Sequence, residues 1–574
     1  ITDYKTTLFK EATSFYSKPI FYLYSMDISG IQDFIYTITS KGALKGLRSR
    51  SFYLEIMMEH LIDSLLEKLF LSRVNLIYSG GGHAYILLPN TEKVRKIVED
   101  FEREVNEWFL EMFETQIYIA GGGAVCSASD FWNEPEGSYR EIFRNISKEI
   151  SFKKLHRYSP KQIIKLNHSG MPYGERECSV CHRHNYLKDG ETECEICWAL
   201  KQMSGNILKG DFFTVTSKKE KTCLPLSGNC YLVTDTESTL RKRMKEDKYY
   251  IRSYSKNKPY SGYYVSTKLW VGDYVNGETF EELGQRATGI ERIAVMRADV
   301  DNLGQAFVRG FENEKNGSKY VTLSRTATFS RKLSMFFKYH INSLLKEGGY
   351  SILEEEAQME KEDDRRNALI VYSGGDDIFI VGAWDDIIGF AVDLHDNLME
   401  YSQDTLKISA GIGIYPSKYP ISIMARETGR LEEAAKSVEG KNAVALFDEK
   451  YTFPWEEFIE NVVEEKLYFI QKYFKVVDEK GKNFLYNLLE LVRKRKEDKI
   501  NIARFAYLLG RMEPKVQRGA KKEEIEEKRD LHREFSRKMY EWIRVEKDAK
   551  ELEMAIYLYV YTKREKEEHD GVNE

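Results

Sequence analysis

The sequence has little of several features that define special classes of protein. Proline is scarce, with 11 residues in a chain of 574. No apolar run approaches the roughly 20 residues that a membrane-spanning helix needs. Lys and Arg total 86 against 91 Asp and Glu, so neither sign of charge dominates. These absences exclude a proline-rich linker and a histone-like protein that coats a polyanion. They also predict no membrane partner. A local basic groove is still compatible with the balanced charge.

The chain has instead the material for several folded domains. Hydrophobic residues make up 42% and charged residues 31% of the sequence, and at ~150 residues per domain the length predicts about four domains. The cysteines number only seven, and four of them form two Cys-x-x-Cys pairs, which favours a metal site over a disulfide framework. The first residues lack the basic region and apolar stretch of a signal peptide. We therefore expect a cytoplasmic protein.

Two segments of the chain repeat one order of motifs. In each segment a strand that ends in Asp is followed by a hairpin with Ser-Gly-Gly at its tip and then by a glycine-rich strand. The motifs are Asp27, Ser79 to His83 and 117–124 in the first segment, and Asp299, Ser373 to Asp377 and 408–414 in the second. Apolar residues recur at helical spacing between the first two motifs. This order predicts two ferredoxin-like palm domains.

The rest of the chain differs from the repeats. Between them lie the cysteine pairs and short β-rich runs, and after the second repeat apolar residues recur at helical spacing. We therefore expect an α+β protein with two palm (nucleotide-cyclase-like) domains, a zinc-binding insert and an all-helical C-terminal domain. The predicted domains are a first palm at 1–159, a zinc-binding linker at 160–286, a second palm at 287–450 and a helical domain at 451–574.

The tip of the second hairpin has the composition of a metal-dependent phosphoryl-transfer site. Asp376 and Asp377 follow Gly374 and Gly375, whose conformational freedom lets a phosphate approach the backbone. Neighbouring carboxylates repel each other, and a hard divalent cation such as Mg²⁺ removes that repulsion by binding to both of them. Asp299 ends the strand expected beside the hairpin and supplies a third carboxylate. The three residues predict a two-metal site for nucleotidyl transfer; the alternative is an ordinary polar turn.

Other residues near the tips are candidates for nucleotide binding. Asp301 either shares the face of Asp299 or is solvated, and Lys441 follows a helix from which it can reach a triphosphate. The first repeat has Gly82-His83 in place of the acid pair, so we interpret it as a binding palm without catalytic metals; a degenerate structural repeat is the alternative. The candidates are Ser373, Gly374, Gly375, Asn302, Gly304 and Lys441 in the second palm, and Asp27, Ser79, Gly80, Gly81 and Gly82 in the first.

The cysteine pairs have the spacing of a structural zinc site. Cys178 and Cys181 are separated by 12 residues from Cys194 and Cys197. Two such knuckles satisfy tetrahedral Zn²⁺, and four thiolates leave no open position for catalysis. The intervening histidines, His182 and His184, are the less suitable ligands.

The combination of these motifs resembles one family. The chain resembles the large subunit of type III CRISPR effector complexes, in its III-A form. The resemblance rests on the paired palms, on Ser-Gly-Gly-Asp-Asp in the second palm only, on the four-cysteine insert between the palms, and on the segments Asp27 to Phe34 and Leu47 to Tyr53. The resemblance covers essentially the whole chain. The Gly-Gly-Asp-Asp tip alone would be shared with diguanylate-cyclase-like palms.

The resemblance implies an ATP-dependent nucleotidyltransferase of an antiviral complex. Such subunits convert ATP into cyclic oligoadenylates with 3′–5′ linkages once target RNA is bound. On this chain it implies that Asp299, Asp376 and Asp377 hold two Mg²⁺ or Mn²⁺ ions, with a donor ATP there and an acceptor ATP against Gly80 to Gly82. The implied partners are the other subunits of the complex, especially the one that holds the 5′ end of the guide RNA, and guide and target RNA through the complex.

The sequence departs from the family at its start and leaves other functions open. The family usually begins with a His-Asp nuclease domain that cuts single-stranded DNA. Here the first palm begins about 20 residues in, and the His-Asp pairs His395-Asp396 and His569-Asp570 lack the ligand set of that domain. We therefore expect nuclease activity only in a longer form. The alternatives are a diguanylate-cyclase-like enzyme that uses GTP and a non-catalytic scaffold subunit, against which the three acids argue.

Overall fold

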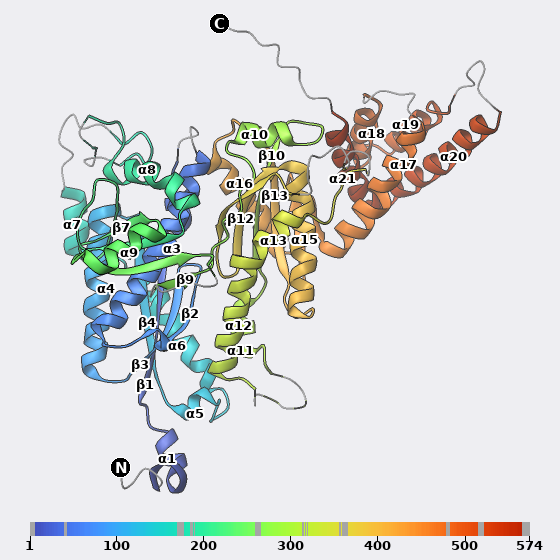
Figure 1. Ribbon diagram of the computed structural model, residues 1–574. Helices are drawn as coiled ribbons and strands as arrows, with labels where there is room; N and C mark the ends of the chain where they lie inside the picture. The colour runs from blue at the N-terminus through green and yellow to red at the C-terminus, as the bar shows by residue number, and fades with distance from the viewer. Residues whose placement is uncertain are drawn as a thin grey trace.

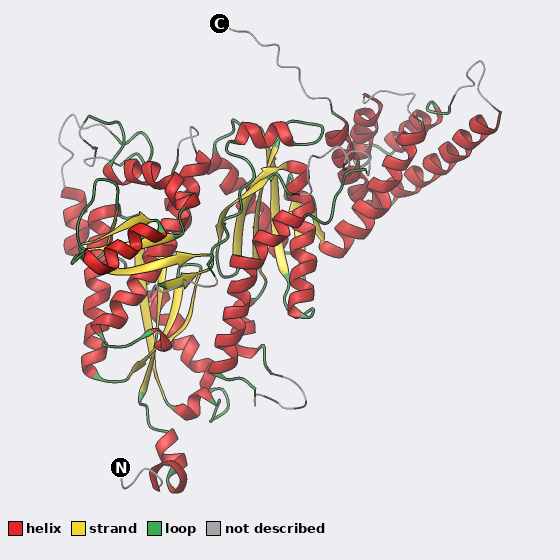
Figure 2. Ribbon diagram, viewed as in Figure 1, coloured by secondary structure: helices red, strands yellow, loops and turns green. Residues whose placement is uncertain are grey.

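A computed structural model gives the fold of the chain (Figures 1 and 2). The residues that it describes are 6–38, 43–168, 177–183, 187–188, 190–258, 266–312, 315, 317, 320–354, 358, 365–477, 483–514 and 522–564. Three sheets and a C-terminal group of helices confirm the predicted α+β class. None of the helices in this described part is both long and apolar enough to cross a membrane. The pair His569-Asp570 lies outside the described residues, and the bounds of the four domains stay a prediction.

The first repeat folds as a four-stranded antiparallel sheet in the order β2-β3-β1-β4, drawn in blue at the lower left of Figure 1. Its strands are β1 (Phe21–Ser29), β2 (Leu76–Gly80), β3 (His83–Pro89) and β4 (Tyr118–Cys126). Its helical segments are η1 (Thr6–Lys10), α1 (Ala12–Tyr16), α2 (Ile31–Tyr36), α3 (Ala43–Lys68), η2 (Arg73–Asn75), α4 (Glu92–Phe113), α5 (Ala128–Phe131), α6 (Ser138–Leu155) and α7 (Pro160–His168). The order strand, helix, hairpin, helix, strand is the palm arrangement that the sequence predicts.

The second repeat forms a six-stranded sheet in the order β11-β12-β10-β13-β14-β15. Its strands are β10 (Ile293–Val300), β11 (Ala368–Ser373), β12 (Asp377–Ala383), β13 (Ile408–Tyr415), β14 (Ala443–Leu446) and β15 (Thr452–Pro454). Its helical segments are α11 (Leu303–Arg309), α12 (Leu323–Met335), η3 (Phe336–His340), α13 (Ile341–Glu347), α15 (Trp384–Ser402) and α16 (Ile421–Lys436). The first four strands in this order repeat the arrangement of the first palm.

The glycine-rich strands of the two palms serve the same packing purpose. In each palm the helix that follows this strand packs back onto it, α6 on β4 and α16 on β13. A Cβ at Gly122 would lie 2.7 Å from the carbonyl oxygen of Ile146, and one at Gly411 would lie 2.3 Å from the backbone nitrogen of Glu432. Only glycine therefore allows the helix to approach this closely.

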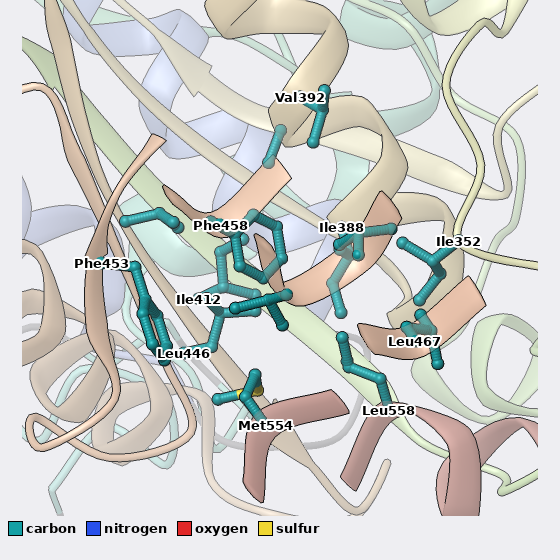
Figure 3. Packing of buried hydrophobic residues seen from close by; sticks show 14 of the residues in the cluster. Ile352, Ile388, Val392, Ile412, Leu446, Phe453, Phe458, Leu467, Met554 and Leu558 are labelled. Atoms are coloured by element: carbon teal, nitrogen blue, oxygen red, sulfur yellow. The ribbon is translucent and has the colours of Figure 1, made fainter. Parts of the chain in front are cut away.

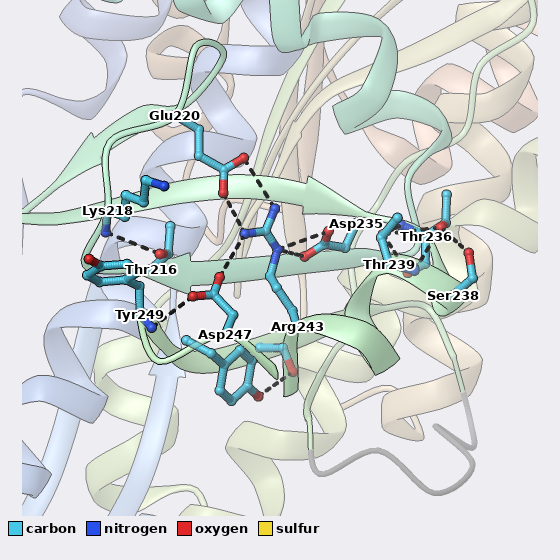
Figure 4. Close-up of polar contacts among 12 residues, drawn as sticks. Thr216, Lys218, Glu220, Asp235, Thr236, Ser238, Thr239, Arg243, Asp247 and Tyr249 are labelled. Carbon is cyan, nitrogen blue, oxygen red and sulfur yellow. Dashed lines mark hydrogen bonds and ion pairs between the residues drawn. The ribbon is translucent and has the colours of Figure 1, made fainter. Parts of the chain in front are cut away.

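The linker forms a five-stranded sheet in the order β6-β7-β5-β8-β9. Its strands are β5 (Phe212–Thr216), β6 (Leu224–Leu226), β7 (Cys230–Asp235), β8 (Tyr250–Lys256) and β9 (Thr267–Leu269), and its helices are α8 (Glu195–Lys209), α9 (Glu237–Glu246) and α10 (Phe280–Arg286). Figure 4 shows Arg243 of α9 at the centre of a polar cluster. Its guanidinium lies 3.0 Å from Asp235, 2.5 Å from Glu220 and 3.3 Å from Asp247. These ion pairs fasten α9 to the end of β7 and to the loop between β5 and β6.

The predicted cysteines come together in a four-cysteine metal site. The Sγ atoms of Cys178, Cys181, Cys194 and Cys197 lie within 4.8 Å of one another, and all four residues are buried. Arg50 of α3 donates to the Cys197 sulfur at 3.0 Å and to the Phe34 carbonyl at 2.9 Å. Arg183 donates to the Cys181 sulfur at 3.3 Å. The two guanidinium groups offset the negative charge that four thiolates carry around a divalent cation.

The C-terminal helices share one core with the second palm. They are η4 (Glu457–Leu467), α17 (Tyr468–Val476), α18 (Asn483–Lys494), α19 (Ile500–Gly510), α20 (Lys522–Arg544) and α21 (Glu546–Lys563). Figure 3 shows Phe458 and Leu467 of η4 and Leu558 of α21 packed against Ile412 and Ile388 of the palm. The apolar face that the sequence predicts for α18 is buried, which confirms it; its residues are Leu485, Leu488, Leu489 and Val492.

We predict that the four-cysteine site holds zinc and stabilises the linker. Metal analysis is expected to find about one zinc per chain, and Cys178→Ser is expected to lower the melting temperature because three thiolates hold the ion more weakly. Cys126→Ser is the matched control, since Cys126 is a buried cysteine outside the cluster. Protein that is purified without chelator and contains no zinc would refute the prediction, as would equal losses of stability in the two variants.

Candidate active site

A cavity of 1060 Å³ lies between the two palms. The second palm contributes Asp299 from the end of β10, and Asp376 and Asp377 from the tip of the β11–β12 hairpin. The first palm contributes Gly81 from its own hairpin tip and several residues of α2, among them Tyr36. Both repeats therefore line a single cavity, and the three carboxylates in it all come from the second palm.

Strand pairing decides which residues meet at this place. In the second palm, β10 pairs with β12 so that Asp299 lies opposite Asp377. In the first palm, the equivalent pairing places Asp27 opposite His83. The first palm therefore has an imidazole at the position where the second palm has a carboxylate.

The carboxylates of the second palm lie where their charge is disfavoured. Burial, with the charges of Asp376 and Asp299, raises the pKa of Asp377 from 3.8 to about 8. Burial and the charge of Asp299 raise the pKa of Asp376 to about 6. Burial also raises the pKa of Asp299, although Lys436 opposes this effect. At neutral pH the metal-free site therefore carries fewer than three negative charges, and a divalent cation would relieve their repulsion.

Lys436 of α16 forms an ion pair with one of the three carboxylates. Its Nζ lies 2.6 Å from Asp299 Oδ2 and 2.6 Å from Glu432 Oε1. Asp377 Oδ1 is buried without a hydrogen-bond partner. Oxygen donors of this kind suit Mg²⁺ or Mn²⁺. Within the described residues, the four cysteines are the only group of three or more His, Cys, Asp or Glu residues whose ligand atoms all lie within 4.8 Å of one another. A cation shared by the three acids would therefore draw them closer and compete with Lys436 for Asp299.

Three residues that the sequence singles out belong to a structural loop. Asp301 Oδ2 accepts hydrogen bonds from Ser409 Oγ at 2.8 Å and from the Asn442 backbone N–H at 2.9 Å. Lys441 Nζ donates to Asn302 Oδ1 at 2.9 Å. These bonds tie the loop after β10 to the loop after α16. Neither Lys441 nor Asn302 lines the cavity of the three carboxylates.

Other predicted residues support the hairpin tips or lie elsewhere. The Ser373 hydroxyl donates to the Phe337 carbonyl, and Ser79 Oγ donates to Glu59 Oε1 at 2.8 Å. Both serines thus hold their tips in place through helices behind them. Gly304 lines a separate cavity of 130 Å³ between α11, α12 and the first palm.

Asp27 of the first palm is already paired. Its Oδ2 lies 2.8 Å from Lys154 Nζ and 3.4 Å from His83 Nδ1. Burial raises the pKa of Asp27, but the hydrogen bonds from His83 and Lys154 outweigh burial, and the pKa is lower than its usual value. The charge of this carboxylate is therefore balanced by side chains of its own palm.

The two hairpin tips are in contact. A Cβ at Gly81, whose φ is +59°, would lie 3.5 Å from Asp376 Oδ1. A Cβ at Gly375 would lie 2.3 Å from the Tyr78 hydroxyl oxygen of the first palm. At Gly375 a Cβ would clash with the Tyr78 hydroxyl, so glycine there lets the two tips approach closely, whereas at Gly81 a Cβ would be in ordinary van der Waals contact and the positive φ is what favours glycine.

Several cavity residues were missed by reasoning from the sequence. Lys436 stands one helical turn after Glu432, and that spacing on the helix after the glycine-rich strand was the available signal. Tyr372 lines the cavity, and Tyr78 lies against Gly375 of the second tip. Each tyrosine precedes Ser-Gly-Gly in its repeat, so a repeated Tyr-Ser-Gly-Gly motif could have revealed them. No sequence signal placed His182, which lies between the cysteine pairs and lines the cavity.

Three parts of the chain match known protein families. Residues 20–169 match Csm1 subunit domain B, residues 292–445 match the second palm domain of Cas10/Cmr2, and residues 471–565 match the second helical domain of the Cmr2 subunit of the CRISPR RNA silencing complex. These matches coincide with the two palms and the C-terminal helices.

Individual relatives cover nearly the whole chain. The CRISPR system single-strand-specific deoxyribonuclease Cas10/Csm1 (subtype III-A) of Mycobacterium tuberculosis is 45% identical over 585 residues, which cover 99% of this chain and 70% of that protein. The Streptococcus thermophilus relative of the same name is 41% identical over 570 residues, which cover 97% of this chain and 70% of that protein. A crystal structure of a Csm1–Csm4 cassette in complex with one ATP matches with a TM-score of 0.67 and 25% identity, over 94% of this chain and 70% of that one. The chain therefore belongs to the Cas10/Csm1 family, the large subunit of subtype III-A CRISPR systems.

Proposed function

We propose that this chain converts ATP into 3′–5′ cyclic oligoadenylates in the cavity between its palms, when target RNA is bound to its complex. One observation carries the proposal. Both hairpin tips line a single cavity, but only one of them presents a carboxylate pair, beside Asp299. Such a site has room for two nucleotides, and its single acid pair suits the formation of one 3′–5′ linkage between them.

The residues have separate roles in this proposal. Asp299, Asp376 and Asp377 hold two Mg²⁺ or Mn²⁺ ions, which when bound supply activation of the acceptor's 3′-hydroxyl and stabilisation of the leaving pyrophosphate. The glycines at 80–82 admit the acceptor ATP on the other side. Lys436 and two arginines of α16, Arg426 and Arg430, line the cavity and are suited to bind triphosphate oxygens.

The relatives support this assignment. The ATP in the Csm1–Csm4 cassette indicates that a protein of this fold binds the substrate. The first palm needs no metals of its own, because His83 and Lys154 already balance Asp27. Holding the two nucleotides in line can supply up to ~7–11 kcal/mol of the barrier by proximity. We propose as partners a Csm4-type subunit next to the palms, which is the expected holder of the guide RNA 5′ end, and guide and target RNA through the complex.

The acid pair is predicted to be essential for synthesis. Asp376→Ala with Asp377→Ala should abolish oligoadenylate formation and leave the melting temperature at or above that of the wild type, because the change removes two carboxyl groups whose ionisation is disfavoured by burial. Asp100→Ala, at an exposed ion pair with Arg103, is the control. The readout is incorporation of label from ATP, with GTP in parallel. Undiminished synthesis by the double variant would contradict the proposal, and label from GTP alone would favour the diguanylate-cyclase alternative.

Metal-free protein should be stabilised by Asp377→Asn in a pH-dependent way. The pKa of Asp377 rises from 3.8 to about 8 on folding, so the wild-type penalty is absent at pH values well below 3.8, grows as the pH rises and is complete above about 8. The gain in melting temperature should follow the same course, and Mn²⁺ should stabilise only the wild type. Asp301→Asn should instead lose stability, because Ser409 and Asn442 lose a charged acceptor. A pH-independent difference would contradict the assignment.

The composite site predicts unequal effects on the two nucleotides. Gly81→Trp should block synthesis by filling the acceptor side of the cavity, while ATP with metal still binds at the second palm. Gly205→Trp is the control, because nothing lies within 4 Å of a Cβ at that exposed position. Calorimetry with a non-hydrolysable ATP analogue should find one site fewer in Gly81→Trp. Wild-type synthesis by this variant would show that the tips do not share one site.

A further inference from the structure

One face of helix α3 carries a carboxylate at every fourth residue: Glu55, Glu59, Asp63 and Glu67. We call these four residues the acidic ridge. Successive members of such a row turn by about 40° around the helix axis, because four residues exceed one turn of 3.6. Like charges at this spacing repel each other unless each has a partner of its own. The ridge therefore needs several different neighbours around the helix.

Each carboxylate of the ridge is bound by a different set of partners. Lys338 Nζ of η3 lies 2.5 Å from Glu55, and Ser79 Oγ and Arg73 lie 2.8 Å and 2.7 Å from Glu59. Asp63 accepts from Arg73 at 2.7 Å and from the Tyr254 hydroxyl of β8 at 2.8 Å, and Glu67 pairs with Arg252 of β8 at 2.5 Å. One end of the ridge thus binds the second palm, its middle binds the first hairpin tip, and its other end binds the linker sheet.

The ridge stands directly behind both hairpin tips. Ser79 of the first tip binds Glu59, and Ser373 of the second tip binds the carbonyl of Phe337, the neighbour of Lys338. A cavity of only 30 Å³ separates these groups, and its walls include both tips together with Glu55, Glu59 and Lys338. The contact between Lys338 and Glu55 therefore connects the supports of the two tips directly.

Stability alone does not account for this contact. The side chains of Lys338 and Glu55 are only 12% and 20% exposed, and burial of an ion pair costs about as much desolvation energy as the pair returns. A pair of apolar residues of similar volume would hold the helices together as well. A buried ion pair is, however, favourable in only one geometry. Displacing one partner costs free energy, because it leaves the other charge buried and uncompensated.

We propose that the Lys338–Glu55 pair is a positioning contact that sets the spacing of the two hairpin tips, and that the remainder of the acidic ridge ties this spacing to the linker sheet. The proposal rests on the proposed function, since the spacing matters only when donor and acceptor nucleotides share the cavity. In-line attack needs the reacting atoms about 3–3.5 Å apart, and an error of about 1 Å costs roughly 100-fold in rate. Displacement of either palm along α3 would produce an error of this kind.

The test compares variants in the assembled effector complex with target RNA, ATP and Mn²⁺. Glu55→Leu with Lys338→Met keeps the volume and removes the charges, and it should retain the wild-type melting temperature, KM for ATP and Mn²⁺ affinity while kcat falls by about 100-fold. Glu55→Lys with Lys338→Glu, which rebuilds the pair in reverse, should recover most of kcat. Lys68→Met is the control, because Lys68 lies on the same helix in an exposed pair with Glu104.

A second readout does not depend on activity. Spin labels at the exposed residues Glu92 of the first palm and Lys418 of the second report the distance between the palms. The apolar double variant should broaden or shift that distance, and the charge swap should restore it. Wild-type kcat and an unchanged distance in the apolar variant would overturn the inference. A wild-type complex that makes no oligoadenylate would instead contradict the proposed function, and the distances would still decide the role of the pair.

Discussion

The architecture depends on one helix that three sheets share. Helix α3 has buried residues along most of its length, and one continuous core joins it to the first palm, the four-cysteine site, the linker sheet and one face of the second palm. None of these parts can shift without repacking that core, because protein interiors are close-packed. The contact of the two hairpin tips follows from this constraint, and the cavity between the palms follows from the contact.

Only the second palm presents an acid pair to the cavity, and electrostatics gives a reason for this difference between the palms. In the second palm, burial raises the pKa of Asp376 and Asp377, so the acid pair destabilises the metal-free fold. In the first palm, the equivalent position is His83, which with Lys154 balances Asp27. Keeping a single acid pair limits that cost to one half of the molecule. The first palm instead contributes a glycine, Gly81, to the cavity wall beside the acid pair.

The four-cysteine site is joined to the cavity through a short path. Arg50 bridges the Cys197 sulfur and the carbonyl of Phe34 in α2, and neighbouring residues of α2 line the cavity. His182, from the segment between the cysteine pairs, lines the same cavity. A site that is structural by its ligands thus also supports part of the cavity wall.

The sequence by itself determined the features that are local or repeated. The two cysteine pairs, the order of strands and hairpins in each palm, and the apolar face of α18 are short patterns, and the structure confirms them. The place of Asp299 beside Asp377 also followed from the sequence. The repeated order of motifs implies the order of the strands in the sheet, and that order makes the strand ending in Asp299 the neighbour of the hairpin.

Only the tertiary structure decided which side chains meet across long distances in the chain. The sequence directed attention to Lys441, but Lys441 binds Asn302 and it is Lys436 that reaches Asp299. Lys338 and Glu55 are 283 residues apart and belong to different palms. Their contact depends on how helices pack, and packing depends on the combined shape of many side chains. No pattern within one segment records that information, so the spacing of the two tips is a property of the folded chain alone.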